Sequence, residues 1–260
     1  MSVDPRNVRR AFGHVAPELP HHGARLDPSP MQAGAMPARV SLLDVRGPTL
    51  DQETVGSCVM NATSAASALL GRRVGEIRED SPLALYYAVR QRRGSLDADG
   101  GSTIADALRV AEEFGLYPLA SWPNDPRMFL PPGGPPPDFA EASSRRRVVN
   151  WEPLAHDLVT LRWTLFSGYP VIAGIRTFDT FSNDAAWSTG RVAMPSRESQ
   201  SVGGHAILLV GYDDTTSEFV FQNSWGPFYG ENGVGRIPQP YITDPFLCTE
   251  IAAVRAVRSA

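Results

Sequence analysis

The sequence predicts an α+β fold built from two lobes. Helical spacing of apolar residues prevails over about residues 39–130, whereas short apolar runs typical of strands prevail over about residues 139–255. Between them, the proline- and glycine-rich segment 131–137 can form neither a helix nor an interior strand. With 260 residues, of which 42% are hydrophobic, the chain is long enough to bury a core of its own.

Four helices are expected. The first spans residues 58–70, where small and apolar side chains form a continuous face, and Gly71 is expected to end it. Ser81 begins the second helix, because serine caps a helix well and proline follows at the first helical position. The third spans residues 103–114 before a glycine, and a fourth is expected within residues 156–167.

The second lobe is expected to be built from strands. Residues 39–45 look extended, and the run Arg145–Arg147 is expected to form a solvated face. Four further runs are apolar, short and bounded by turn residues, which indicates strands. They are residues 171–175, 206–212, 219–222 and 251–254.

Composition excludes several classes of protein. Two cysteines are too few for a disulfide scaffold or a four-cysteine zinc site, and a net charge of −4 argues against nucleic acid as the main partner. No motif for a metal, nucleotide or flavin is present, so no cofactor is expected. All 24 basic residues are arginine, which either a GC-rich genome or selection against lysine modification would explain.

The sequence also bears on location. No run approaches about 18 apolar residues, so no membrane-spanning helix is expected. The first residues lack the apolar run of a secretory signal, and two free thiols suit a reducing compartment. We therefore expect a cytoplasmic protein, or one exported without a cleavable signal peptide.

Three residues form a candidate catalytic set. Cys58 begins a predicted helix, whose free N–H groups and dipole favour a thiolate. His205 begins an apolar strand after two glycines, and Asn223 ends the next strand. If these strands pair, the amide of Asn223 can orient the imidazole of His205, which is the arrangement of nucleophile, base and orienting residue used in covalent catalysis.

These segments resemble those of the papain-like cysteine proteases. The residues from Gln52 to Cys58 resemble the segment around the family's nucleophile, Gly203-Gly204-His205-Ala206 its histidine segment and Asn223-Ser224-Trp225-Gly226 its asparagine segment. His205 follows Cys58 by 147 residues, within the roughly 130–150 residues that the family shows. The resemblance spans about residues 40–255 and implies the papain-like fold, with a helical left lobe, an antiparallel β-barrel-like right lobe and the active site in the cleft between them.

The resemblance also implies a role for each matching residue. Cys58 matches the nucleophile, His205 the general base and acid, Asn223 the residue that orients it, and Gln52 the side-chain donor of the oxyanion hole. A papain-like thiol pKa falls from about 8.5 to about 3–4, so a thiolate–imidazolium pair is expected at rest. The family's substrate-binding positions correspond to Gly100, Gly101, Gly204 and Trp225, the last of which resembles an aromatic that shields the His–Asn contact.

Some positions depart from the family pattern. Val59 replaces the usual aromatic after the nucleophile, and Val55 replaces a cysteine that secreted members use in a disulfide. The chain therefore resembles bacterial, disulfide-free members more than lysosomal ones, and Cys248 is expected to be a buried bystander. We expect the aromatic residues Phe178, Phe181 and Trp187 to pack in the core. A place in the lining of the cleft is the alternative.

The N-terminal extension, residues 1–38, is too short for the long helical propeptide of lysosomal relatives. We hypothesise that it partly covers the cleft and restrains activity; a tail or a targeting segment is the alternative. Its pair His21-His22 is expected to be a solvated loop and no metal ligand.

Three classes of function remain open at this point. The first is a cysteine peptidase acting on a peptide or protein through a thioester. A papain-fold amidase, deamidase or transacylase would keep the thioester and change the acceptor. A non-catalytic binding protein would have lost one of the four catalytic residue types, all of which are present. Cleavage specificity and oligomeric state are not predicted.

Overall fold

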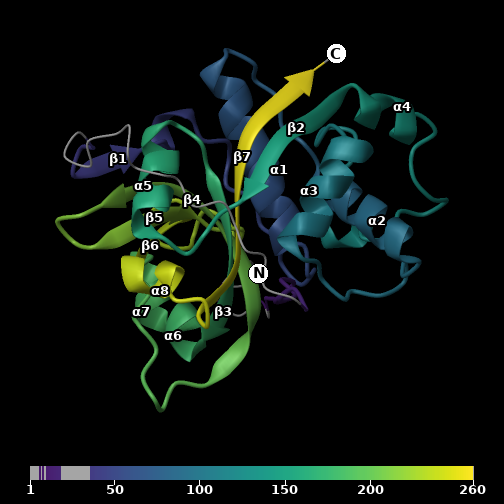
Figure 1. The fold of residues 1–260 in the computed structure, drawn as a ribbon. Coiled ribbons are helices and arrows are strands. Elements are labelled where there is room, and N and C mark those ends of the chain that lie inside the picture. The colour runs from purple at the N-terminus through teal and green to yellow at the C-terminus, as the bar shows by residue number, and fades with distance from the viewer. Residues whose placement is uncertain (1–5, 7, 9, 19–35, 260) are drawn as a thin grey trace.

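The computed structural model describes residues 6, 8, 10–18 and 36–259, and Figure 1 shows a helical part beside a twisted sheet. The predicted α+β class is confirmed. The pair His21-His22 lies outside the described residues. No helix in the described ranges is long and apolar enough to cross a membrane.

The helical part contains three main helices: α1 (Cys58–Arg73), α2 (Pro82–Arg93) and α3 (Ile104–Glu113). Ser81 caps α2 as predicted, because its side chain accepts from the backbone N–H of Ala84. The prediction that Gly71 ends α1 is wrong. The helix continues to Arg73, and Gly71 is buried within it, where a Cβ would lie 3.0 Å from the guanidinium of Arg146.

The antiparallel sheet has seven strands in the described part of the chain. Their path is β2-β7-β3-β4-β5-β6, and β1 pairs with β4. The bounds are β1 (Arg39–Ser41), β2 (Arg146–Pro153), β3 (Val171–Phe178), β4 (Ser201–Asp213), β5 (Glu218–Gln222), β6 (Val234–Pro238) and β7 (Cys248–Ser259). The four apolar runs predicted as strands all lie within these strands. Of residues 39–45, predicted as extended, only Arg39–Ser41 form a strand, and Leu43–Val45 form a 3₁₀ helix.

Short helices connect the strands. They are α4 (Phe139–Ser144), α5 (Leu158–Phe166), α6 (Asp179–Ser182), α7 (Asp184–Thr189) and α8 (Gln239–Thr243), with 3₁₀ helices at Leu43–Val45 and Pro126–Met128. Of these, α5 was predicted within residues 156–167.

The solvated face predicted for the arginine run holds for Arg145, which is exposed, and is wrong for Arg146. Arg146 opens β2 with a fully buried side chain, and its Nε lies 3.0 Å from the buried carboxylate of Asp80. The charge is tolerated inside because Ser67 also accepts from the guanidinium. This network ties the edge strand β2 to the helical part.

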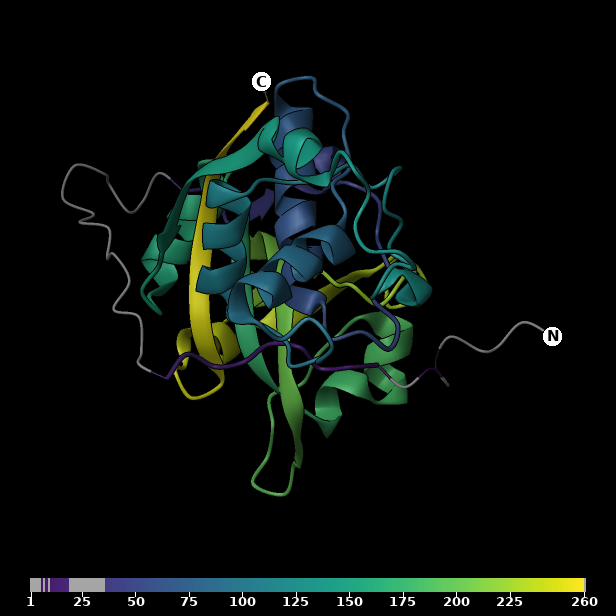
Figure 2. The ribbon, with the colours of Figure 1, turned by 90° about the vertical axis from the view of Figure 1, so that its right-hand side faces the viewer.

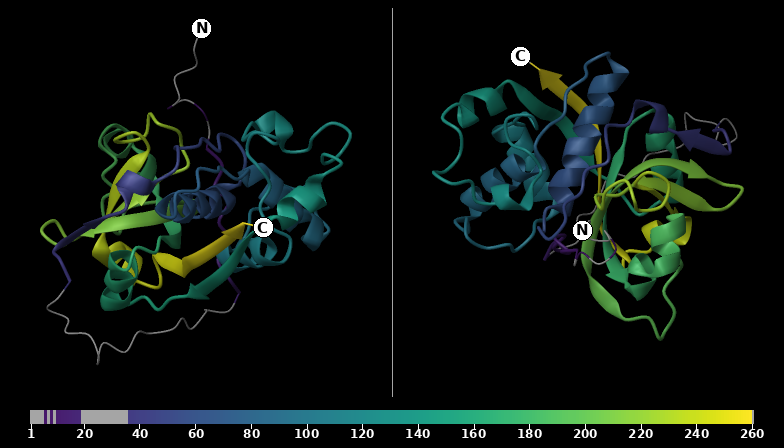
Figure 3. Two further views of the ribbon diagram at one scale, coloured as in Figure 1. Left: turned by 90° about the horizontal axis from the view of Figure 1, so that it is seen from above. Right: turned by 180° about the vertical axis from the view of Figure 1, so that it is seen from behind.

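Helix α1 lies between the other helices and the sheet, as Figure 3 shows from behind. One core cluster joins α1, α2 and α3 to the sheet face carrying Ala206, Leu208 and Val210, while a second fills the opposite face. Thirteen of the sixteen residues of α1 are buried. This central burial holds the N-terminal end of α1 against β4, where the candidate residues gather.

Candidate active site

Cys58 is the first residue of α1, and none of its surface is exposed. The loop before it is fixed by Asp99, whose carboxylate accepts from the backbone N–H of Gly56 at 3.0 Å. Asp99 also accepts from the hydroxyl of Tyr86, which in turn accepts from the N–H of Gly101. The nucleophile's loop and the glycine segment opposite it are therefore held by one hydrogen-bond network.

His205 and Asn223 are brought together by the pairing of β4 with β5. Nε2 of His205 lies 2.8 Å from Oδ1 of Asn223. The buried Nδ1 of His205 has no hydrogen-bond partner in the described part of the chain. Asn223 thus orients the imidazole through Nε2, while β4, which carries His205, packs against α1, which begins at Cys58.

Aromatic rings enclose the imidazole. The ring of Trp225 lies 5.0 Å from that of His205, and the ring of Phe181 lies 5.4 Å away in an edge-to-face arrangement. Trp187 packs against Trp225 at 5.9 Å. Phe181 and Trp187 are core residues as expected, and they also build the wall that excludes water from the contact of His205 with Asn223.

Gln52 lies beside Ser57 and Cys58 through its own network. Its Oε1 accepts from the hydroxyl of Ser224 at 2.5 Å, and its Nε2 donates to the carbonyl of Val55 at 2.9 Å. Nε2 also donates to the carbonyl of Ala11 at 2.9 Å. The amide that resembles an oxyanion-hole donor is therefore engaged by a peptide carbonyl of the chain's own N-terminal segment.

This N-terminal segment, residues 10–18, is called the strap below. Figure 2 shows it in purple, crossing the molecule along the lower ends of the helices. His14 donates its backbone N–H to Gly204 at 3.0 Å, and Val15 donates to Ser102 at 3.0 Å. Ser102 donates back to the carbonyl of Gly13 at 2.8 Å. The strap is therefore bonded to both walls of the site.

The strap fits closely against glycines. A Cβ on Gly101 would lie 2.2 Å from the carbonyl oxygen of Gly13, and a Cβ on Gly204 would lie 2.2 Å from that of His14. Gly100, by contrast, has nothing within 4 Å of its Cβ position. Of the residues predicted to bind substrate, Gly101, Gly204 and Trp225 touch the strap, whereas Gly100 faces open space.

Burial sets the charge state of the pair. Removal from water raises the pKa of the Cys58 thiol to about 11, although backbone hydrogen bonds from Ala206 and Gly13 oppose the rise. It also lowers the pKa of His205 to about 4, against the effect of its bond to Asn223. Both shifts oppose the thiolate–imidazolium pair expected at rest for as long as the strap keeps water from the site, and the ion pair itself stays a prediction.

Sequence reasoning missed several residues of the site. Ser224 orients Gln52, and its position directly after Asn223 in the matching segment was the available signal. Asp99 holds the loop before the nucleophile, and its place before two glycines was a weaker signal. Glu250 is the only acid in β7 and is followed by an apolar run, which is a sign of a buried partner.

Comparison with known proteins gives a consistent result. The sequence pattern of papain family cysteine proteases matches residues 160–243, which include the segment of His205 and Asn223. The chain is similar to xylellain, a cysteine protease from Xylella fastidiosa, at 26% identity and a TM-score of 0.82, over 97% of this chain and 98% of that one. Both matches bear out the resemblance to the papain family of cysteine proteases.

Other papain-like proteins are similar to it as well. An uncharacterized peptidase C1-like protein of Acanthamoeba polyphaga mimivirus is 29% identical over 223 residues, or 80% of this chain and 70% of the viral one. A procathepsin B of Trypanosoma congolense shares the fold, with 15% identity and a TM-score of 0.70 over 98% of this chain and 88% of that one.

This chain has no disulfide, because both Cys58 and Cys248 are free. Cys248 is fully buried in β7, and burial raises the pKa of its thiol. Val59, which stands where the family pattern has an aromatic, is also fully buried and belongs to the α1 core cluster. Its small side chain fits the tight packing of α1 against β4.

Proposed function

We propose that the chain is a cysteine peptidase in which Cys58 attacks the carbonyl of a substrate peptide bond. His205 takes the thiol proton, Asn223 holds the imidazole, and Gln52 with the backbone N–H of Cys58 stabilises the oxyanion. The observation that carries this proposal is the bond of His205 Nε2 to Asn223, which leaves the buried Nδ1 without a partner in the described part of the chain. The family's activity makes proteins and peptides the natural substrates.

The reaction follows covalent catalysis. The thiolate sulfur bonds to the carbonyl carbon, and the electron pair of the C=O bond moves to oxygen, where preorganised donors act most strongly. Collapse of this tetrahedral species breaks the C–N bond, while His205 gives its proton to the leaving amine. Water, deprotonated by His205, then hydrolyses the thioester and regenerates Cys58.

We further propose that the strap keeps this site inactive. Gln52 is occupied by the carbonyl of Ala11, and Gly13 lies so close to the backbone of Gly56, two residues before Cys58, that only a glycine fits there. The strap carbonyl that Gln52 engages therefore belongs to Ala11. Such a segment blocks the site without offering a carbon for attack.

Departure of the strap would also change the chemistry of the pair. Water would return to Cys58 and His205, and solvation favours the charged forms that burial now opposes. The thiolate–imidazolium pair is then the form expected in the open site. Covering and uncovering the site would thus control both access and reactivity.

The experiment is cleavage of a proteome-derived peptide library, with products identified by mass spectrometry. Peptides cut at internal bonds are expected from the wild type, and none from Cys58→Ala. Deamidated or acyl-transferred products without chain cleavage would favour a papain-fold amidase, deamidase or transacylase instead. Absence of Cys58-dependent labelling by an epoxide thiol inhibitor, together with no turnover, would refute every catalytic proposal.

A further inference from the structure

A small cavity lies beside the side chain of Asn223. Residues of α1, Ala206 of β4 and the end of β5 are among its lining, and its volume is about 20 Å³. One buried water molecule needs about 10–15 Å³, so the cavity has room for one. The polar side chains in its lining decide what it can bind.

Three polar atoms in this lining have no hydrogen-bond partner in the described part of the chain. They are Nδ2 of Asn223, Oε1 of Gln222 and Oγ of Ser64. All three residues are buried, with no more than 4% of their surface exposed. Burying such groups without a partner is costly, so the cavity favours a ligand that forms hydrogen bonds.

The mixture of donor and acceptor identifies the ligand. Nδ2 of Asn223 only donates and disfavours a cation, whereas Oε1 of Gln222 only accepts and disfavours an anion. The two acids in the lining, Glu79 and Asp80, are each paired with an arginine already. A buried water typically makes about three hydrogen bonds. One water can accept from Asn223, donate to Gln222 and bond to the hydroxyl of Ser64.

The two amides beside the cavity are each anchored at one end. Oδ1 of Asn223 accepts from the backbone N–H of Ser224 at 2.9 Å, in addition to its contact with His205. Nε2 of Gln222 donates to the carbonyl of Pro48 at 3.2 Å. The terminal torsion of an amide side chain is soft, so a bond at the second end is needed to fix its plane. A water between Nδ2 and Oε1 fixes both planes together.

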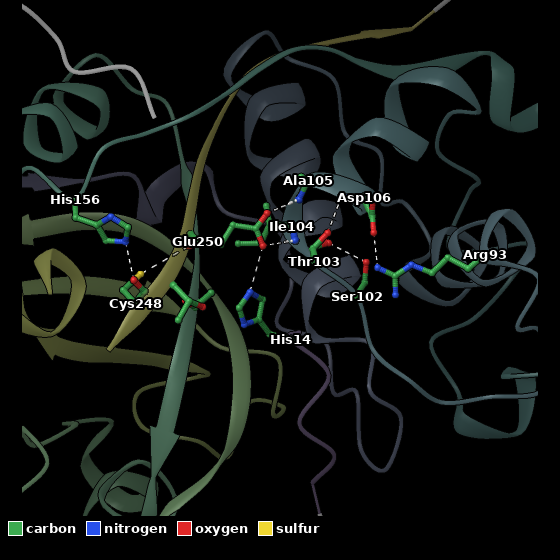
Figure 4. Close-up of polar contacts among 12 residues, drawn as sticks. His14, Arg93, Ser102, Thr103, Ile104, Ala105, Asp106, His156, Cys248 and Glu250 are labelled. Atoms are coloured by element: carbon green, nitrogen blue, oxygen red, sulfur yellow. Dashed lines mark hydrogen bonds and ion pairs between the residues drawn. The ribbon is translucent and has the colours of Figure 1, made fainter. Parts of the chain in front are cut away.

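The cavity is separate from the strap. Figure 4 shows His14 of the strap pointing toward Glu250, whose carboxylate accepts from the first N–H groups of α3. Nε2 of His14 lies 3.3 Å from Oε2 of Glu250. Within the described ranges, no residue of the strap lines the cavity beside Asn223. Departure of the strap therefore leaves the polar groups of the cavity in place, and their effect on Asn223 persists in the open site.

We propose that this cavity binds one ordered water molecule, and that Gln222 and Ser64 are positioning residues that hold the amide of Asn223 through it. The inference rests on the proposed peptidase function, in which Asn223 orients the imidazole of His205. With both ends of the amide bonded, Oδ1 stays directed at Nε2 while the imidazole takes and gives its proton. Loss of the water lets the amide turn about its terminal bond and weakens that contact.

The water site is tested on the full wild-type chain, in a measurement that needs no activity. A high-resolution crystal structure is expected to show a water within hydrogen-bonding distance of Asn223, Gln222 and Ser64. A nuclear Overhauser effect between this water and the side-chain NH2 group of Asn223 is expected in solution. A cavity without water, or a water that does not contact Nδ2 of Asn223, overturns the inference whether or not the chain is a peptidase.

The positioning role is tested with a pair of variants. Gln222→Met and Gln222→Glu both lose the bond to Pro48, but only Gln222→Glu keeps an oxygen that accepts from the water. In Gln222→Met and in Ser64→Ala, kcat per titrated active site is expected to fall by about 2- to 12-fold, the range for one neutral hydrogen bond. Gln222→Glu is expected to restore the wild-type kcat. An unchanged kcat in Gln222→Met, or an equal loss in Gln222→Glu, overturns the inference and leaves the peptidase proposal standing.

The matched control is Gln239→Met. Gln239 is also buried, and its Nε2 donates to Asp214 at 3.0 Å, outside the lining of the cavity. Its replacement costs a hydrogen bond without touching Asn223, so kcat should equal that of the wild type. A loss of kcat equal to that of Gln222→Met would show a general effect of lost stability and would overturn the positioning role.

A spectroscopic readout separates positioning from turnover. In nitrogen-15 spectra of the full chain, the signal of Nε2 of His205 is expected to move in Gln222→Met and to stay in Gln239→Met, because only the first changes the contact with Asn223. Movement of this signal without any peptide cleavage would support the positioning role and contradict the peptidase proposal. A signal that stays in Gln222→Met would overturn the inference even where kcat falls.

Discussion

Replacement of Gly13 by alanine should release the strap. A Cβ added at this position would lie 1.9 Å from the carbonyl oxygen of Gly56, 2.2 Å from its carbon and 2.6 Å from its Cα. Normal contacts are well beyond 3 Å, and backbone atoms next to the nucleophile's helix cannot move aside as a flexible side chain would. The strap itself must therefore lift.

The size of the effect follows from the bonds around Gly13. Lifting breaks the bond from Ser102 to its carbonyl and the bond from His14 to Gly204. At a net 0.5–1.5 kcal/mol each, about 1–3 kcal/mol of closing free energy is lost. Because about 1.4 kcal/mol corresponds to a factor of ten, the open population rises by about 5- to 150-fold.

The assay is hydrolysis of a fluorogenic peptide by the full-length chain, with active sites titrated by an epoxide inhibitor. In Gly13→Ala, the rate of peptide cleavage should rise by about 5- to 150-fold. Val15→Ala is the control, since this side chain is 42% exposed and its backbone bond to Ser102 is retained. Equal initial rates for wild type and Gly13→Ala, with equal folding stability, would refute inhibition by the strap.

Three further outcomes are expected. Gln52→Ala should lower kcat, measured per titrated active site, by about 10²–10³-fold, whereas an unchanged kcat would remove Gln52 from the oxyanion hole. Because burial raises the pKa of Cys58 to about 11, its alkylation by iodoacetamide should rise about tenfold per pH unit from neutral pH toward 11. In Gly13→Ala this curve should shift to lower pH, and identical curves would contradict the effect of burial. Arg146→Ala should lower the free energy of unfolding by up to about 3–5 kcal/mol in urea titrations, because it removes the buried partner of the Asp80 carboxylate and leaves Arg78 as its remaining arginine. The exposed neighbour Arg145→Ala should change it little, and equal effects would contradict this account.

Local sequence signals predicted the structure correctly where the residues that determine it lie in one short segment. Ser81 with the following proline predicted the start of α2, and small side chains at helical spacing predicted the central helix beginning at Cys58. These local signals failed where a contact with a residue far away in the sequence determines the local structure or the burial of a side chain. Gly71 stays helical because it packs against Arg146, and the charge of Arg146 is buried because Asp80 meets it from another element.

The sequence by itself determined the fold class, the family and the order of Cys58, His205 and Asn223 along the chain, because these depend on residue type and spacing. The bounds assigned to the two lobes and the catalytic roles stay predictions. Only the tertiary structure decided that the strap crosses the site, that the thiol of Cys58 is buried beneath it, and that His14 meets Glu250. Those two residues are separated by 236 positions. No local pattern encodes such a contact, since it exists only when β7, α3 and the strap close on one another and exclude water.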